Sequence, residues 1–481
     1  MRTPSGAVSG GHEKVIDTAA EILEAGGNAA DAAISAYLMA CVAEPCMASL
    51  GAGMLALYWP NGGKPLILDA FCQTPKVKRP EDEIEFFPVL VDFGEEKELF
   101  YAGMGAVAIP AVVSGLFELH ERLGSIPLTE LCQPAIEACK YGVPLSDFQH
   151  HDLILLEKIF RKDHILTDIF FKDNKLVDPG TLIKMPEFAE YLDFLSRESS
   201  REFYEGEFAK SLLDMSREYG GHITREDLAQ VSAEWSPALN MKYLGAHIFS
   251  PGFPSFGGWL VKYWFDNLAR DTEDDYREKK GNAIWSTSKV ARDGLAQFQS
   301  MKQNGTSHFN IIDRFGNALS MTFSIGEGSG RVIRGTGVHM NNMLGEAALL
   351  PGGFHSWQED VRMISMMSPV ALFHEERKTR IILGTGGAGR IPLMLSQVMQ
   401  DWISGERSLS EVINSPRCHF DGATWQCEPG YPLHDDLRNK AVNKWSTNNM
   451  FFGGVHAILD RGHDMEAVGD KRRDGVGKLI Y

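Results

Sequence analysis

Apolar positions recur three and four residues apart in the first part of the chain. This helical spacing runs from Glu13 to Glu24 and stops at the pair Gly26-Gly27. Asn28 is a residue type that caps helices, so a second helix is expected from Ala29, where an alanine-rich face would permit very close packing.

Two buried strands are predicted next, over Met54 to Trp59 and Pro65 to Phe71, with a turn at Asn61-Gly62-Gly63 between them. The long segment from about Val112 to Arg270 combines helical periodicity with abundant charge and with Pro and Gly punctuation. This segment is therefore predicted to be mainly helical.

Strand and loop signals dominate after about Lys302. His308 to Asp313 and Ala318 to Ser324 are predicted strands around a turn at Arg314 to Asn317, and the glycine-rich loop Gly326 to Gly330 follows. Three further elements are expected, namely a short strand, a loop and an amphipathic helix: Arg380 to Leu383, Gly384 to Gly389, and Ile391 to Ile403.

Composition limits the functions that this chain can have. Its 481 residues carry 47 Lys and Arg against 64 Asp and Glu, a net charge of −17, and this acidic surplus disfavours nucleic acid as a partner. With 44% hydrophobic and 23% charged residues the chain is typical of a folded protein. Its length allows about three domains or one large α/β unit.

Apolar stretches and cysteines bear on location. Met1 to Gly11 has no apolar core of signal-peptide length. The longest apolar stretch, Ala29 to Leu50, is broken by Asp31 and Glu44, so it predicts a buried helix and no membrane span. The seven cysteines are an odd number without C-x-x-C spacing, which favours a reduced, intracellular chain. Because no signal peptide is seen, a cytoplasmic location is expected.

His150-His151-Asp152 superficially has the composition of a metal site. Adjacent side chains project in different directions, however, and cannot easily converge on one ion. A solvated loop is the preferred interpretation of this segment, and no metal site is predicted.

Gly384 to Gly389 matches the pattern G-x-G-x-x-G between a strand and a helix. Such a loop can bind a dinucleotide pyrophosphate, and Asp401 and Glu406 lie about where a ribose-binding acid is expected. A tight strand-to-helix turn explains the glycines as well, and so does an oxyanion hole of exposed N–H groups. Beyond Glu406 the sequence lacks the next strand signal of a Rossmann unit.

Thr306-Ser307-His308, at the start of a predicted strand, is a second candidate. A Thr hydroxyl is a poor nucleophile unless a base accepts its proton, and one solution is the residue's own α-amino group at a chain terminus. Internal Thr306 would gain that amine only if the Gly305–Thr306 bond were cut. Spacing alone does not favour this interpretation.

Several short motifs along the whole chain form one recognisable pattern. They are Ala19–Ala33, Gly51–Gly53, Pro110–Leu116, Thr306–Phe309, Asp313–Ala318, Asn341–Met343, Ser365–Pro369, Gly384–Gly387 and Asp470–Gly475. In this order they resemble the γ-glutamyltranspeptidase family of N-terminal-nucleophile hydrolases.

The resemblance implies an α/β (α+β) fold, a four-layer αββα sandwich, made as a precursor that cleaves itself before a Thr. Thr306 stands at that position, so a large segment, 1–305, and a small segment, 306–481, would remain together as a heterodimer. The freed Thr306 would be nucleophile and base, because an α-amino group with a pKa near about 8 is substantially neutral at working pH. No metal or organic cofactor is implied.

The resemblance also implies supporting groups. Ser324 stands where the family has a Thr whose hydroxyl supports the nucleophile, and the backbone N–H groups of Gly387 and Ala388 match the oxyanion-hole pair. Ala388 replaces a Gly, so its Cβ must fit the same turn. His308 shares a strand face with Thr306, where a packing or orienting role is expected.

The implied γ-glutamyl pocket departs from the family pattern. Phe71 replaces the Arg that binds the α-carboxylate, and an aromatic ring cannot supply that charged bidentate contact. Gly326 stands where an Asn is usual, Met343 where a Glu or Gln binds the substrate, and Met366 in place of the second of two serines.

Other residues of the implied pocket are retained or could compensate. Glu346 lies near the position of an acid that binds the substrate amino group, and Ser365 is the first of the two serines. Arg331, Arg334 and Arg390 flank the glycine-rich loops. One of these arginines is a candidate for binding an acidic substrate.

We therefore expect an autoprocessing amidohydrolase or acyltransferase that cleaves a small amide or γ-glutamyl-like bond through an acyl-Thr306 intermediate. Glutathione is not expected to be the main substrate. Two alternatives stay open: a binding or scaffold protein of this fold that has lost catalysis, and a dinucleotide-binding enzyme that uses Gly384 to Gly389.

Overall fold

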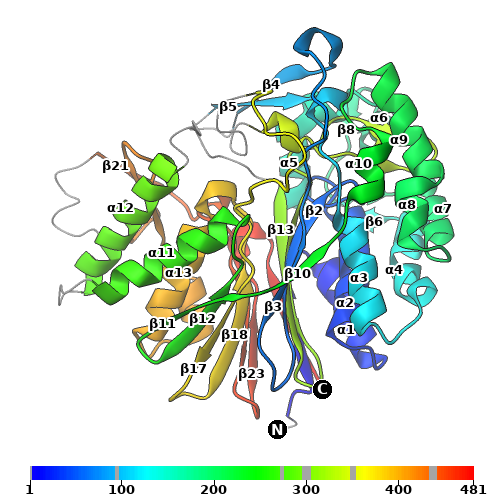
Figure 1. Cartoon of the computed structure of the whole chain (residues 1–481). Helices are drawn as coiled ribbons and strands as arrows, with labels where there is room; N and C mark the ends of the chain where they lie inside the picture. Colours follow the sequence, from blue (N-terminus) through cyan, green and yellow to red (C-terminus); the bar gives the residue numbers. More distant parts are fainter. Residues whose placement is uncertain (1–2, 93–96, 271–275, 295–304, 347–353, 433–440) are drawn as a thin grey trace.

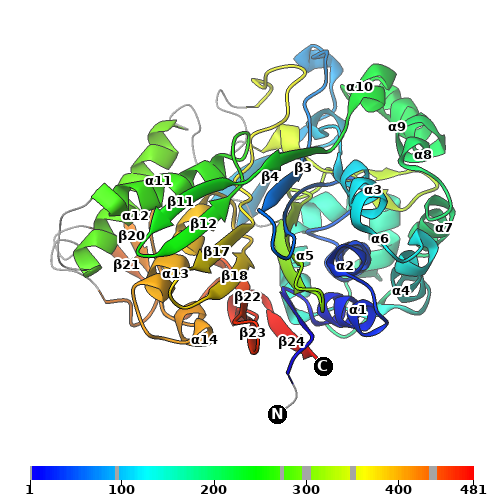
Figure 2. The ribbon, with the colours of Figure 1, turned by 60° about the horizontal axis from the view of Figure 1, so that its bottom comes forward.

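Two large sheets form the centre of the molecule in a computed structural model, which describes residues 3–92, 97–270, 276–294, 305–346, 354–432 and 441–481. One sheet has seven strands and the other has six. Every strand pair within both sheets is antiparallel. Helices cover the outer face of each sheet, so the layer order is α, β, β, α (Figures 1 and 2).

The seven-stranded sheet takes strands from distant parts of the chain. In spatial order they are β10 (Glu234–Pro237), β3 (Leu66–Ala70), β2 (Gly53–Trp59), β14 (Ala318–Ser324), β13 (Thr306–Ile312), β1 (Gly6–Gly10) and β24 (Val476–Ile480). The six-stranded sheet runs in the order β11 (Leu239–Tyr243), β12 (Ala246–Ser250), β17 (Val370–His374), β18 (Thr379–Gly384), β22 (His456–Asp460) and β23 (Met465–Val468).

The helices fall into two groups. On the side of the seven-stranded sheet lie α1 (Glu13–Glu24), α2 (Ala29–Ala43) and α3 (Val112–Leu123), which pack on its strands. The same group includes α4 (Leu128–Tyr141), α5 (Asp147–Phe160), α6 (His164–Phe170), α7 (Pro186–Leu195), α8 (Ser200–Glu205), α9 (Glu207–Glu218) and α10 (Arg225–Gln230). The six-stranded sheet is covered by α11 (Phe256–Arg270), α12 (Tyr276–Gly294), α13 (Ile391–Ile403) and α14 (Leu409–Ile413).

Short strands complete the described structure. They are β4 (Phe87–Asp92), β5 (Lys97–Ala102), β6 (Val143–Pro144), β7 (Phe171–Lys172), β8 (Lys175–Leu176), β9 (Leu182–Ile183), β15 (Val332–Ile333), β16 (Val338–His339), β19 (Cys418–Phe420), β20 (Trp425–Cys427) and β21 (Val442–Lys444).

The predicted N-terminal helices are confirmed. The Asn28 side chain accepts hydrogen bonds from the backbone N–H groups of Ala30 and Asp31, and Asp31 closes a capping box at the start of α2. Every residue of α2 is buried, as expected for a core helix. None of the helices in the described part of the chain has the length and apolar character that crossing a bilayer requires.

The segment Val112 to Arg270 is mainly helical, as predicted, although short strands interrupt it, among them β10, β11 and β12. Two other expectations from the sequence are wrong. His150-His151-Asp152 lies in α5 and not in a loop, and Asp152 is buried. The helix Ile391–Ile403 has the predicted bounds, but it has no solvent-exposed polar face, because all of its residues are buried.

The space between the two sheets is apolar at one end and polar at the other. Ala7, Leu57, Ile312, Ile382 and Ile458 belong to one hydrophobic cluster there. Farther along β13 the same face carries Asn310, whose amide donates a hydrogen bond to the carbonyl oxygen of His456 in β22. The start of β13 therefore lies at a polar seam between the sheets.

Candidate active site around Thr306

Thr306 is the first residue of β13 and is buried. The strand register places it directly opposite Ser324, the last residue of β14. Thr306 Oγ1 donates a hydrogen bond to Ser324 Oγ at 3.3 Å, and Ser324 Oγ donates one to the carbonyl oxygen of Gly305 at 2.7 Å. One hydroxyl thus contacts both the candidate nucleophile and the carbonyl of the peptide bond that precedes it.

Two glycines permit this close arrangement. A Cβ on Gly305 would lie 1.5 Å from the carbonyl oxygen of Gly326. Gly326 has a φ of +69°, and a Cβ there would lie 2.0 Å from a carboxylate oxygen of Glu346. The predicted site residues Gly326 and Glu346 therefore lie side by side next to Gly305, and Gly326 N–H donates to Ser324 Oγ at 3.0 Å.

The loop Gly384 to Gly389 packs directly on the start of β13. A Cβ on Gly386 would lie 2.1 Å from the Thr306 carbonyl oxygen, and one on Gly384 would lie 2.1 Å from the His308 ring. Gly387 and Ala388 follow with φ values of +123° and +51°. Ala388 thus adopts the left-handed turn despite its Cβ, and the predicted oxyanion-hole residues directly follow Gly386, which packs against the Thr306 carbonyl oxygen.

The same geometry argues against a dinucleotide site. β18, which leads into this loop, pairs antiparallel with both β17 and β22, whereas a Rossmann unit is built from parallel strands. Asp401, considered as a ribose ligand, forms a buried ion pair with Lys280 at 2.7 Å. The Asp401 carboxylate is therefore already paired with a lysine inside the helical layer.

His308 has the orienting and packing contacts that were expected. Its Nδ1 lies 2.8 Å from Thr322 Oγ1, and its Nε2 lies 3.0 Å from Asn310 Oδ1. Burial lowers the pKa of His308 to about 3, so the ring is neutral at physiological pH. A neutral ring with both nitrogens bound is suited to fixing the strand face.

Two charged groups that were not predicted from the sequence lie behind the candidate nucleophile. Arg473 Nη1 donates to the Thr306 carbonyl oxygen at 3.2 Å, and Ser307 Oγ donates to Glu44 Oε1 at 2.8 Å. Both charged side chains are buried. Burial raises the pKa of Glu44 to about 7, although the hydrogen bond from Ser307 and the charge of Arg473 act against that rise.

Two of the residues that depart from the γ-glutamyl pocket pattern lie in the same cluster. Phe71 and Met343 belong to one buried apolar cluster with Trp357, Met363 and Met367. An unpaired guanidinium at Phe71 would be costly in such surroundings. The side chains at these two predicted pocket positions therefore belong to one contiguous apolar cluster.

The remaining predicted pocket residues lie near α11. Ser365 Oγ accepts a hydrogen bond from the Met367 N–H, and the Ser365 carbonyl accepts one from Gly257. Met366 packs with Leu260 of α11 in a separate apolar cluster. The structure does not bring the Met366 side chain into the cluster of Phe71.

The three candidate arginines contact other protein groups. Arg331 forms an ion pair with Glu85, and Arg334 forms one with Glu218 at 2.7 Å. Arg390 Nε donates to the carbonyl oxygen of Phe451 at 2.6 Å. They do not converge on Thr306.

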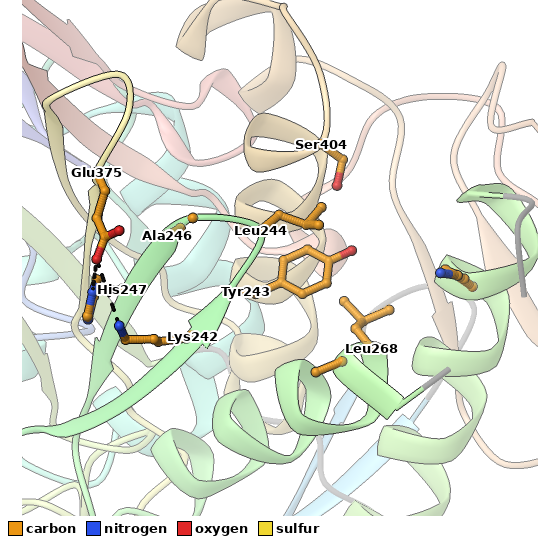
Figure 3. A pocket seen from close by; sticks show the side chains of 11 residues that line it. Lys242, Tyr243, Leu244, Ala246, His247, Leu268, Glu375 and Ser404 are labelled. Carbon is orange, nitrogen blue, oxygen red and sulfur yellow. Dashed lines mark hydrogen bonds and ion pairs between the residues drawn. The ribbon is translucent and has the colours of Figure 1, made fainter. Parts of the chain in front are cut away.

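A cavity of about 510 Å³ lies elsewhere, at the turn between β11 and β12. Figure 3 shows Lys242 and His247 directed toward Glu375, at 3.8 and 2.6 Å, with Leu244 and Leu268 on the other side. Its lining includes none of the residues around Thr306.

The arrangement around Thr306 can be compared with known proteins. The model of the γ-glutamyltranspeptidase family matches residues 16–265 and 267–480, which is nearly the whole chain. The chain belongs to the γ-glutamyltranspeptidase family. The resemblance noted from the motifs is therefore confirmed.

Relatives of this γ-glutamyltranspeptidase family member are distant but full-length. The glutathione hydrolase proenzyme of Pseudomonas aeruginosa is 26% identical, over 99% of this chain and 94% of the relative. The capsule biosynthesis protein CapD proenzyme of Bacillus anthracis is 24% identical, over 98% and 90%. Both relatives are named as proenzymes.

A solved structure confirms the fold of the family member. The crystal structure of cephalosporin acylase from Bacillus halodurans superposes with a TM-score of 0.84 at 22% identity, covering 99% of this chain and 96% of that one. This likeness establishes the shared mixed α/β architecture, which is an N-terminal-nucleophile hydrolase fold.

Proposed function

We propose that this chain is an autoprocessing N-terminal threonine hydrolase or acyltransferase. It would cleave itself between Gly305 and Thr306 and then act on a small amide or γ-glutamyl-like bond through an acyl-Thr306 intermediate. The observation that carries this proposal is the pair of hydrogen bonds that joins Ser324 Oγ to Thr306 Oγ1 and to the Gly305 carbonyl oxygen. A donor on that oxygen stabilises the negative charge that develops there during attack.

Self-cleavage requires the Thr306 hydroxyl and the Gly305 carbonyl group to react with each other inside the folded chain. Thr306 Oγ1 adds to the Gly305 carbonyl carbon, the bond from that carbon to the Thr306 nitrogen breaks, and the hydroxyl proton is transferred to that nitrogen, which becomes the α-amine. Water then hydrolyses the resulting ester, which gives a Gly305 carboxylate and a free Thr306 amine and hydroxyl. The sheet contacts support continued association, because β13 lies between β14 and β1, which belong to 306–481 and 1–305 respectively.

Turnover would reuse the same atoms. The released α-amine takes the proton of Thr306 Oγ1 as the hydroxyl attacks an amide carbonyl, and then returns it to the leaving amine. The backbone N–H groups of Gly387 and Ala388 would bind the oxyanion. Water or an acceptor amine then removes the acyl group from Thr306. These steps use groups of the chain itself.

The proposed donor is an amide whose acyl group does not depend on an α-carboxylate contact. The apolar cluster that contains Phe71 and Met343 supports this preference. The names of related proteins include both glutathione hydrolase and cephalosporin acylase, so the acyl donors of this fold differ. Glu346, beside Gly326, is the proposed partner for an amino group of the donor.

Intact mass spectrometry of the purified protein tests the proposal. The wild-type chain should give fragments of 305 and 481 − 305 = 176 residues, Thr306→Ala should stay whole, and Thr306→Ser should still split. Chromogenic γ-glutamyl and simple acyl anilides, assayed side by side, should favour the simple acyl group. A folded wild-type chain that never splits would contradict the enzyme and favour a scaffold protein, and bound nicotinamide absorbance would favour the dinucleotide alternative.

A further inference from the structure

Two charged side chains from distant parts of the chain hold the first two residues of β13. Arg473, in the short 3-10 helix Lys471–Arg473, contacts the Thr306 carbonyl oxygen at 3.2 Å. Glu44, the residue that ends α2, accepts the Ser307 hydroxyl at 2.8 Å. These contacts leave the Thr306 side chain directed to Ser324 on the neighbouring strand.

Three carboxyl groups partly compensate the burial of Arg473. Burial lowers the pKa of the Arg473 guanidinium, and Asp152 of α5, Asp470 and Glu44 act against that fall. The Asp152 side chain is buried, and desolvation raises its pKa to about 7 while Arg473 acts against that rise. A buried cation is costly unless carboxylates compensate it, so a cluster of this kind indicates a position that must carry charge.

Other titratable groups also face this cluster. Asp474 raises the pKa of both Glu44 and Asp152 through its negative charge. His456 of β22 is affected by Arg473 and by Asp470, and burial lowers its pKa to about 4. A neutral His456 leaves Arg473 as the cation that contacts Thr306.

Cleavage would remove one covalent restraint on the position of Thr306. The intact chain holds Thr306 through its peptide bond to Gly305, whereas after cleavage it becomes a chain end, and chain ends are poorly ordered unless other groups fix them. The amine and hydroxyl must remain available for chemistry. The carbonyl oxygen of Thr306 and the side chain of Ser307 are then the groups through which the protein can fix this end.

We propose that Arg473 is a positioning residue for the nucleophile: by binding the Thr306 carbonyl oxygen, with Glu44 on Ser307, it keeps the amine and hydroxyl of the cleaved Thr306 aligned. This inference rests on the proposed function. The guanidinium has a second effect, because a neighbouring positive charge disfavours protonation of the α-amine. Arg473 thus also favours the neutral amine that acts as base.

The matched pair of neighbouring arginines makes the proposal testable. Arg472 is also buried, but it directs its guanidinium to Glu428 at 2.7 Å and to Asp470 at 3.1 Å. Arg473→Lys keeps the charge and changes the hydrogen-bond geometry, Arg473→Met removes both, and Arg472→Lys is the control. Circular dichroism and thermal unfolding select the folded variants for comparison.

The readout is the reaction of Thr306 with phenylmethylsulfonyl fluoride, which needs no known substrate. The hydroxyl oxygen attacks sulfur, fluoride leaves, and the α-amine takes the proton, so the labelling rate reports the aligned, neutral amine. Intact mass of the small fragment gives that rate at each pH.

Thr306 of the Arg473→Lys variant should be labelled about tenfold to a hundredfold more slowly than in wild type. The pH at which the labelling rate is half of its maximum should stay the same. Arg473→Met should be slower and have its midpoint at higher pH, and Arg472→Lys should react like wild type. A folded Arg473→Lys chain that fails to split, while Arg472→Lys splits, shows the same loss of alignment. If both Arg473 variants keep the wild-type labelling rate and pH midpoint, the proposed role of Arg473 is wrong. Equal losses of labelling rate in the Arg472 and Arg473 variants would contradict it as well. A wild-type chain that stays whole would contradict the proposed function too.

Discussion

Ser324 donates a hydrogen bond of 2.7 Å to the carbonyl oxygen of Gly305, the carbonyl that Thr306 would attack. Removal of this donor leaves the developing oxyanion without that stabilisation. Ser324→Ala should therefore slow self-cleavage by about a hundredfold to a thousandfold, and Ser324→Thr, which keeps the hydroxyl, should stay close to wild type. A time course of intact mass after purification measures both rates, and an alanine variant that splits as fast as wild type would contradict this role.

Gly305 itself should be sensitive to the smallest side chain. A Cβ would lie 1.5 Å from the Gly326 carbonyl oxygen, so Gly305→Ala must displace the backbone that presents the scissile bond. We expect the variant to split at least about tenfold more slowly, because small displacements of reacting atoms strongly reduce rates. Gly281→Ala in α12, where a Cβ meets nothing within 4 Å, is the matched control. Equal splitting of the two variants would show that the approach to Gly326 is not needed.

Local patterns predicted the parts of this site that are local in sequence. β13, β14 and the glycine-rich loops follow from alternation and from turn residues, and the motif order added the role of Thr306. The edge strands β10 and β11 were missed because their residues are largely exposed or half-buried, and no continuous apolar run marks them.

Contacts between distant segments could not be predicted in this way. Glu44 interrupts an apolar stretch and Arg473 lies in a charged motif near the end, and no periodicity relates them. The burial of α13 was missed for a related reason. Its polar residues have partners from other elements: Gln397 bonds the Cys418 carbonyl, and Gln400 accepts from the Trp264 indole.

Ala388 has a left-handed backbone conformation, which is energetically unfavourable for an L-residue. Its φ is +51°, and a left-handed conformation costs about 1–2 kcal/mol for a residue with a Cβ. Ala388→Gly should therefore leave the free energy of unfolding unchanged or raise it by up to about 1 kcal/mol, and it keeps the backbone N–H group of the proposed oxyanion hole. Ala138→Gly, inside α4, should instead cost about 1 kcal/mol. Urea denaturation of both variants compares them, and equal losses would contradict strain at Ala388.

Glu44 should make the stability of the uncut chain depend on pH. Its pKa is about 7 in the folded protein against 4.5 ordinarily, so the folded state retains the proton over a range in which the unfolded state has lost it. Stability should accordingly fall as pH rises from about 4.5 to about 7 and then change no further on account of this group. Glu44→Gln removes that loss, and Asp152 and Asp470 still favour the charged form of Arg473. The variant should therefore gain about 1–3 kcal/mol over its parent at pH 8, and little at pH 4.5.

The Thr306→Ala chain, which is expected to stay whole, is the suitable parent for this measurement because only one chain then unfolds. Urea denaturation between about pH 4.5 and 8 gives the free energy of unfolding at each pH. Glu24→Gln, at an exposed position of α1, is the control and should run parallel to the parent throughout. If Glu44→Gln also runs parallel to the parent, Glu44 is ionised in the folded protein as readily as in the unfolded chain, and the charge cluster behind Thr306 compensates its burial completely.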